Sequence, residues 1–87
     1  MEIGTATRAL LEQHLAEEIV RARKAAKLTQ RELAERAGVN QAMVSRLEKG
    51  ARLPRLETLL AIAEATGSVL DLRLTRSRTV TGPLKIR

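Results

Sequence analysis

Five side chains in the stretch 41–49 have the chemistry needed to contact the edges of DNA bases. In a helix that turns by about 100° per residue they share one arc: Gln41, Ala42, Ser45, Arg46 and Lys49. Gln can form two hydrogen bonds with adenine, Arg can do the same with guanine, and the Ala methyl can contact the thymine methyl. Because an α-helix fits the major groove of B-DNA, this arc indicates a DNA-reading surface.

The remaining residues of 41–49 predict how this helix packs against the rest of the protein. Met43, Val44 and Leu47 fall on the opposite arc and are apolar, so we expect them to face a core. Asn40 is a favourable N-cap, and it predicts a helix over residues 41–49. The stretch therefore has one side for packing and one side for contact.

A second short helix is predicted directly before it. Thr29 and Glu32 form a T-x-x-E capping box, which predicts a helix over residues 30–37. Gly38 permits a sharp turn into the next helix. Ala34 is small where the two helices must approach each other. Two short helices joined by a turn that contains Gly are typical of a helix-turn-helix motif.

Two further helices are predicted to enclose this pair. The first covers about residues 7–26, and five apolar residues form its stripe: Leu10, Leu11, Leu15, Ile19 and Val20. The second covers about residues 55–66, and we expect five of its residues to be buried: Leu56, Leu59, Leu60, Ile62 and Ala63.

The charge distribution agrees with a polyanionic partner. The 87-residue chain has a net charge of +6. Residues 20–55 alone contain ten basic and three acidic residues. Solvated helices often carry Lys and Arg, which is enough to explain many of these bases. It explains four of them poorly, since they cluster around the candidate reading helix and the loop after it: Arg46, Lys49, Arg52 and Arg55.

The segment after the last helix has two interpretations. Leu70, Leu72 and Leu74 alternate with polar residues, which is typical of a half-buried strand. The run 68–71 (SVLD) could instead be the capping box of a fifth helix. We favour the strand, because three alternations outweigh one short motif. We therefore expect a domain over residues 1–75, with its strand at 69–75, and a mobile basic tail over residues 76–87.

Several classes of function are excluded by composition. The chain contains no Cys, Phe, Tyr or Trp and a single His, His14. We therefore expect no metal site, no cofactor and no thiol nucleophile, and we find no enzyme signature. The longest apolar run, residues 59–63, is far shorter than the roughly 18 residues of a membrane span. No signal peptide is evident, so we expect a cytoplasmic protein without membrane contact.

Two runs of the sequence resemble the XRE family, the helix-turn-helix family of the lambdoid phage repressors and Cro. They are residues 28–39 (LTQRELAERAGV) and 44–50 (VSRLEKG), and the resemblance extends over about residues 15–67. It implies a compact all-α DNA-binding domain that acts as a dimer on a palindromic operator. It also implies that Gln41, Ala42 and Arg46 face base edges, and Ser45 shares their arc.

The same resemblance assigns roles to the flanking residues. It implies backbone contacts from four residues: Gln30, Asn40, Lys49 and Arg52. Arg55 replaces the small hydroxyl residue that the family often has there, which weakens a helix cap and adds a candidate phosphate contact. Arg23 and Glu48 match a pair that forms an internal salt bridge in the family, and we interpret both as structural.

The predicted strand resembles one branch of this family, the HipB-type antitoxins. That resemblance implies a strand that pairs across a homodimer through Leu70, Leu72 and Leu74. It also implies a nucleoid-associated repressor that regulates its own operon and binds a toxin such as a HipA-type kinase. Two alternatives remain open. One is a stand-alone or phage-type regulator without a toxin, and the other is an interaction module whose main task is to neutralise a toxin.

Overall fold

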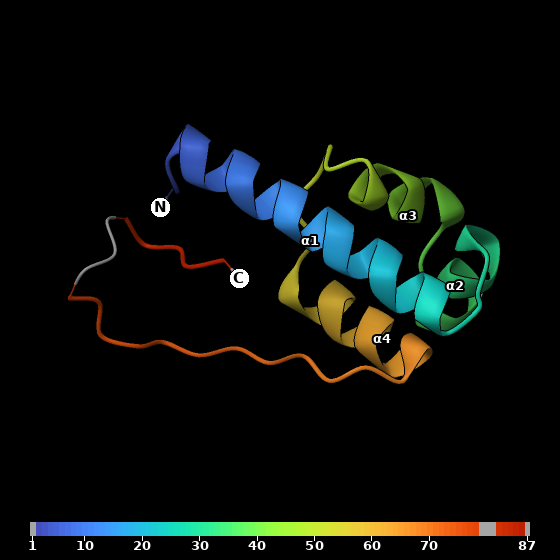
Figure 1. Ribbon diagram of the computed structural model, residues 1–87. Coiled ribbons are helices and arrows are strands. Elements are labelled where there is room, and N and C mark those ends of the chain that lie inside the picture. The colour runs from blue at the N-terminus through green and yellow to red at the C-terminus, as the bar shows by residue number, and fades with distance from the viewer. Residues whose placement is uncertain (1, 79–81, 87) are drawn as a thin grey trace.

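The computed structural model describes residues 2–78 and 82–86, and within them the chain forms four α-helices. They are α1 (Thr5–Ala25), α2 (Gln30–Ala37), α3 (Gln41–Glu48) and α4 (Leu56–Thr66). Helix α1 packs against α3 and α4, and α2 packs against the same two helices. In the view of Figure 1, α1 runs along the molecule with α3 above it and α4 below it.

The two short helices begin where their caps predict. The Thr29 hydroxyl accepts a hydrogen bond from the Glu32 amide at 3.0 Å, and the Glu32 carboxylate accepts one from the Thr29 amide at 2.9 Å. The Asn40 side chain accepts a hydrogen bond from the Met43 amide at 2.8 Å. These bonds satisfy backbone amides that have no partner inside the first turn of a helix.

The limits of the other elements differ slightly from prediction. Helix α1 begins two residues earlier, at Thr5, and α4 begins at Leu56, with Arg55 as an N-cap that makes no side-chain hydrogen bond. Helix α3 ends at Glu48, one residue before the predicted end. Lys27, in the turn between α1 and α2, has a φ of 59°. This is the left-handed region, which residues other than Gly rarely adopt.

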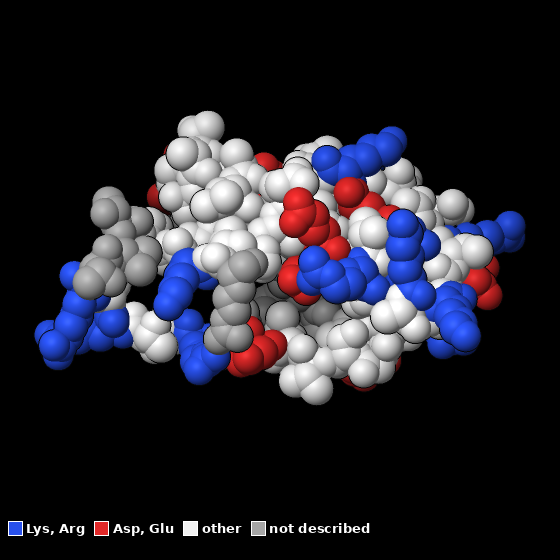
Figure 2. All heavy atoms as spheres, in the orientation of Figure 1, with Lys and Arg blue, Asp and Glu red and all other residues white. Residues whose placement is uncertain are grey.

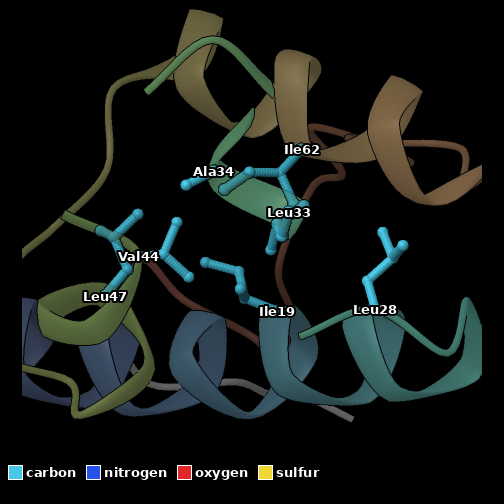
Figure 3. Packing of buried hydrophobic residues seen from close by; sticks show 7 residues of the cluster. All are labelled: Ile19, Leu28, Leu33, Ala34, Val44, Leu47 and Ile62. Atoms are coloured by element: carbon cyan, nitrogen blue, oxygen red, sulfur yellow. The ribbon is translucent and has the colours of Figure 1, made fainter. Parts of the chain in front are cut away.

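The core is small and entirely aliphatic. Figure 3 shows seven of its side chains, contributed by all four helices and by the turn after α1: Ile19, Leu28, Leu33, Ala34, Val44, Leu47 and Ile62. Leu33, Val44 and Leu47 are the largest fully buried side chains among the described residues. These three residues belong to α2 and α3, so the helix pair that the sequence singled out is also anchored most deeply.

Leu10, which we placed on the apolar stripe of the first helix, is exposed, and so are Leu56 and Leu60, which we expected to be buried. At about 100° per residue, Leu10 lies about 180° around α1 from the buried Ile19. Leu56 and Leu60 lie roughly 120° and 160° around α4 from the buried Ile62. The prediction was wrong because the apolar stripes of α1 and α4 are wider than the faces that their neighbours cover.

The expected strand at residues 69–75 and the alternative fifth helix are both absent from the described chain. Gly67 ends α4 with a φ of 69°, and the Ser68 hydroxyl is hydrogen-bonded to the Thr66 hydroxyl at 2.8 Å rather than to a following helical turn. A strand needs a neighbouring strand, and the described residues supply none. Figure 1 shows the segment extended below α4, on the side opposite α3, with Leu72 and Leu74 exposed. Of the predicted mobile tail, residues 79–81 and 87 lie outside the described residues.

Candidate nucleic-acid interface

Helices α2 and α3 form a helix-turn-helix with a tight connection. Gly38 adopts a φ of 72°, which a residue without Cβ tolerates at little cost. The Val39 amide then donates to the Ala34 carbonyl at 3.0 Å, which closes the end of α2. Ala34 itself is buried against the adjoining helices. The turn therefore fixes the direction in which α3 leaves α2.

Helix α3 has the two sides that the sequence indicates. Val44 and Leu47 are buried, and Met43 is half-buried against the core. The predicted contact residues on its other side are exposed, apart from Ser45, which is half-buried: Gln41, Ala42, Arg46 and Lys49. Because the apolar residues hold α3 to the body, its polar arc is presented to solvent on one side of the molecule.

An ion pair joins Arg23, near the end of α1, to Glu48, the last residue of α3. The Arg23 Nε donates to Glu48 Oε2 at 2.7 Å, and the Arg23 Nη2 donates to Glu48 Oε1 at 3.0 Å. The two side chains are only 15% and 6% exposed. The hydrogen bond to Glu48 raises the pKa of Arg23 above its usual value, so the guanidinium stays charged. Arg23 also donates to the Leu28 carbonyl at 2.9 Å, which ties α1 to the turn before α2.

Gln30 takes part in this cluster, which the sequence did not reveal. Its Nε2 donates to Glu48 Oε1 at 3.0 Å, and its side chain is half-buried rather than freely exposed. The family resemblance implied only a contact between Gln30 and the DNA backbone. A contact between residues 18 positions apart, on two different helices, leaves no periodic or capping signal in the sequence.

The remaining predicted backbone contacts lie around the ends of α3. Asn40, Arg52 and Arg55 are exposed. Arg52 and Arg55 both line one open groove beside α3, together with Met43 and Leu47. In Figure 2, Lys and Arg side chains also gather at the end of the molecule where α2 lies, and separately along the extended segment after α4. The surface beside the helix-turn-helix thus offers cations to a polyanion.

The described residues contain no group of three or more His, Cys, Asp or Glu side chains that could hold a metal ion. None of the helices in that part of the chain is long and apolar enough to cross a membrane.

Two relatives of this chain are named as HTH-type transcriptional regulators. The chain is 37% identical over 62 residues to an uncharacterized HTH-type transcriptional regulator (y4dL) of Sinorhizobium fredii, which covers 71% of this chain and 30% of that protein. It is 36% identical over 58 residues to an uncharacterized HTH-type transcriptional regulator of Haemophilus influenzae, covering 67% of this chain and 59% of the relative. The chain thus spans less than two thirds of the length of either relative.

A solved structure that resembles this chain is also that of a transcriptional regulator. The crystal structure of an HTH_3 family transcriptional regulator from Vibrio cholerae superposes with a TM-score of 0.68 at 26% sequence identity. The match covers 71% of this chain and 35% of that one. The HTH_3 helix-turn-helix family itself matches residues 19–71, which include α2, α3 and α4 and the last part of α1. With more than half of its length matched, the chain belongs to the HTH_3 helix-turn-helix family of XRE type.

Proposed function

We propose that this chain is a sequence-specific DNA-binding transcriptional regulator that acts as a repressor at a palindromic operator and has no enzymatic activity of its own. One observation carries this proposal: α3 is anchored by Val44 and Leu47 and presents Gln41, Ala42 and Arg46 to solvent. These residues have the hydrogen-bonding and apolar groups that read base edges in the major groove. Such a regulator works where the DNA is, at the nucleoid.

The proposed backbone contacts follow from position. Lys49 and Arg52 lie at and just beyond the end of α3, where the chain leaves the groove and passes phosphates. Gln30 and Asn40 lie at the beginnings of α2 and α3, where helix N-termini favour anions. Arg55 shares a groove with Arg52 and extends this set. These residues supply affinity, whereas the α3 arc supplies sequence preference.

The proposed regulator is a homodimer. One helix-turn-helix covers one half-site, and two half-sites lie about 34 Å apart, one turn of DNA. The segment 69–75 supports this proposal, because its leucines are not used by the helical core: Leu70 is half-buried, and Leu72 and Leu74 are exposed. Pairing with the same segment of a second copy would give each segment the neighbour that it lacks within the chain.

Selection from random DNA duplexes tests the proposal. The purified chain is expected to enrich a two-fold symmetric sequence whose half-sites are one helical turn apart. Arg46→Ala is the matched variant, because it removes one reading group from the exposed arc and leaves the anchoring residues in place. Enrichment of no sequence, or of the same sequence by Arg46→Ala, would contradict the proposed reading surface.

A second candidate function is the antitoxin role within a type II toxin–antitoxin pair. It is favoured by the exposed leucines at 72 and 74, which give the extended segment an apolar side outside the helical body. In this second candidate a toxin such as a HipA-type kinase, rather than a second copy of the chain, covers that side. Co-expression with each neighbouring gene product tests this candidate: a stable complex that lowers the toxicity of the partner supports it. A chain that regulates its operon with no toxic neighbour is instead the stand-alone regulator.

A further inference from the structure

The side-chain amide of Gln30 lies where three helices meet. Gln30 is the first residue of α2, and its Nε2 donates to Glu48 Oε1 of α3 at 3.0 Å. The same oxygen accepts from the Arg23 Nη2 of α1 at 3.0 Å. The Glu48 side chain is only 6% exposed, and the contact with Gln30 is partly buried. The Gln30 amide is therefore attached to a buried, charged group rather than to solvent.

The chemistry of this contact fixes which end of the amide faces inward. An ionised carboxylate only accepts hydrogen bonds, so only the NH₂ end of Gln30 can face Glu48. The NH₂ group has two hydrogens, and the contact uses one of them. One N–H and the carbonyl oxygen remain available at the N-terminal end of α2. The opposite orientation would place two acceptors against each other.

Arg23 makes Glu48 a rigid acceptor. The guanidinium contacts both carboxylate oxygens, at 2.7 and 3.0 Å, and it is itself held by the Leu28 carbonyl at 2.9 Å. The carboxylate is thus fixed from the side of α1 before any ligand is bound. Hydrogen bonds to an ionised group are roughly twice as strong as those between neutral groups. Glu48 therefore holds Gln30 more firmly than an exposed neutral partner could.

We propose that Glu48 is a positioning residue for DNA binding: it holds the Gln30 amide in one orientation in the free protein, with the second N–H presented to a DNA phosphate. The proposal rests on the DNA-binding function proposed above, and it adds a contact that orients Gln30 before DNA is bound. A side chain that is ordered in advance loses less conformational entropy when the complex forms. The Arg23–Glu48 pair thereby serves the interface as well as the fold.

The free protein provides the first test. The chain has four side-chain amides, so their ¹⁵N relaxation can be measured separately: Gln13, Gln30, Asn40 and Gln41. We expect the Gln30 amide to be rigid and the exposed Gln41 amide to be mobile. Gln13 is the matched control, because its Nε2 contacts Glu17 at 2.9 Å on an exposed surface. If Gln30 is as mobile as Gln41, the proposal is overturned.

Two variants separate positioning from simple structural support. Glu48→Gln removes the charge that holds the amide. Gln30→Asn shortens the side chain so that it cannot reach Glu48, and leaves the Arg23–Glu48 pair unchanged. We expect each to increase the mobility of the amide at position 30 and to weaken binding of the selected operator by about 3- to 10-fold. Circular dichroism below the unfolding transition identifies the variants that remain folded.

A double-mutant cycle on operator affinity completes the test. In a Gln30→Met background there is no amide to orient, so Glu48→Gln should then change affinity by less than about 2-fold. Equal losses in both backgrounds would mean that Glu48 acts only through the fold, which overturns the proposal. If Glu48→Gln fails to fold, the mobility of the Gln30 amide relative to the Gln41 amide in the wild-type chain decides. If the wild-type chain bound no duplex, the proposed function would fail, while an amide that is rigid only with Glu48 present would still establish the positioning contact.

Discussion

At the scale of single residues, we expect the most specific effect on base preference from Arg46. It is exposed on the polar arc of α3, next to the buried Leu47. Arg46→Ala should relax base preference at one operator position and weaken binding of the preferred site by about 1–3 kcal/mol. Titration against a set of single-base operator variants measures this effect. An unchanged preference profile would remove Arg46 from the reading surface.

Lys49 and Arg52 are expected to behave differently from Arg46. Both residues are proposed phosphate contacts, so replacing either of them by Gln should weaken the binding of all DNA sequences alike. Each replacement should also reduce the slope of log K against log salt by roughly 0.9, the contribution of one released counterion. Affinity measured at several salt concentrations gives the slope. A changed sequence preference with an intact slope would contradict this assignment.

Lys27 shows how a single backbone angle can limit stability. Its φ of 59° places a side chain in a region that disfavours Cβ. Lys27→Gly should therefore raise the free energy of unfolding by about 1 kcal/mol, since the relief of strain exceeds the entropy that Gly adds to the unfolded chain. Lys24→Gly, inside α1, is the matched control and should destabilise by about 1 kcal/mol. Chemical denaturation compares the two variants, and destabilisation by both would show that the turn is not strained.

At the scale of elements, α2 depends on its capping box. Thr29→Ala should lower the free energy of unfolding by about 1 kcal/mol, because the Glu32 amide loses its partner. The hydrogen bond from the Thr29 backbone also holds the pKa of Glu32 below its usual value. Because the folded pKa is the lower one, this contribution is present above the unfolded pKa near 4.5 and is lost as pH falls through the folded pKa. Glu32→Gln removes this carboxyl, so thermal unfolding across pH 3–6 should show a smaller acid dependence in Glu32→Gln than in the wild-type chain.

At the scale of the whole molecule, the decisive question is how two copies join. Leu72 is 67% exposed on a segment that has no β neighbour within the described chain. Leu72→Asp should shift the proposed dimer to monomer and weaken operator binding strongly, although the extended segment after α4 lies on the side of α4 opposite α3 (Figure 1). Thr75→Asp adds the same charge to the other face of the segment and should leave the dimer intact. Sedimentation equilibrium measures both, and a dimeric Leu72→Asp with unchanged affinity would exclude this segment as the interface.

The sequence by itself determined the helix-turn-helix and the division of α3 into two sides. Residues 30–37 are helical as predicted, and Thr29 and Asn40 cap as predicted, because capping is a contact between residues only three positions apart. Val44 and Leu47 are buried as predicted, because the 3.6-residue period of a helix separates its faces without knowledge of the partner.

Only the tertiary structure decided what depends on neighbours distant in the sequence. The exposure of Leu10, Leu56 and Leu60 depends on how much of each apolar stripe another helix covers. The contact between Gln30 and Glu48 depends on how α2 lies against α3. The alternating leucines at 70–74 satisfy a strand pattern, yet a strand requires a partner, and the described part of this chain contains none. Local signals fix which residues begin a helix and face inward, whereas contacts between elements are fixed by packing alone.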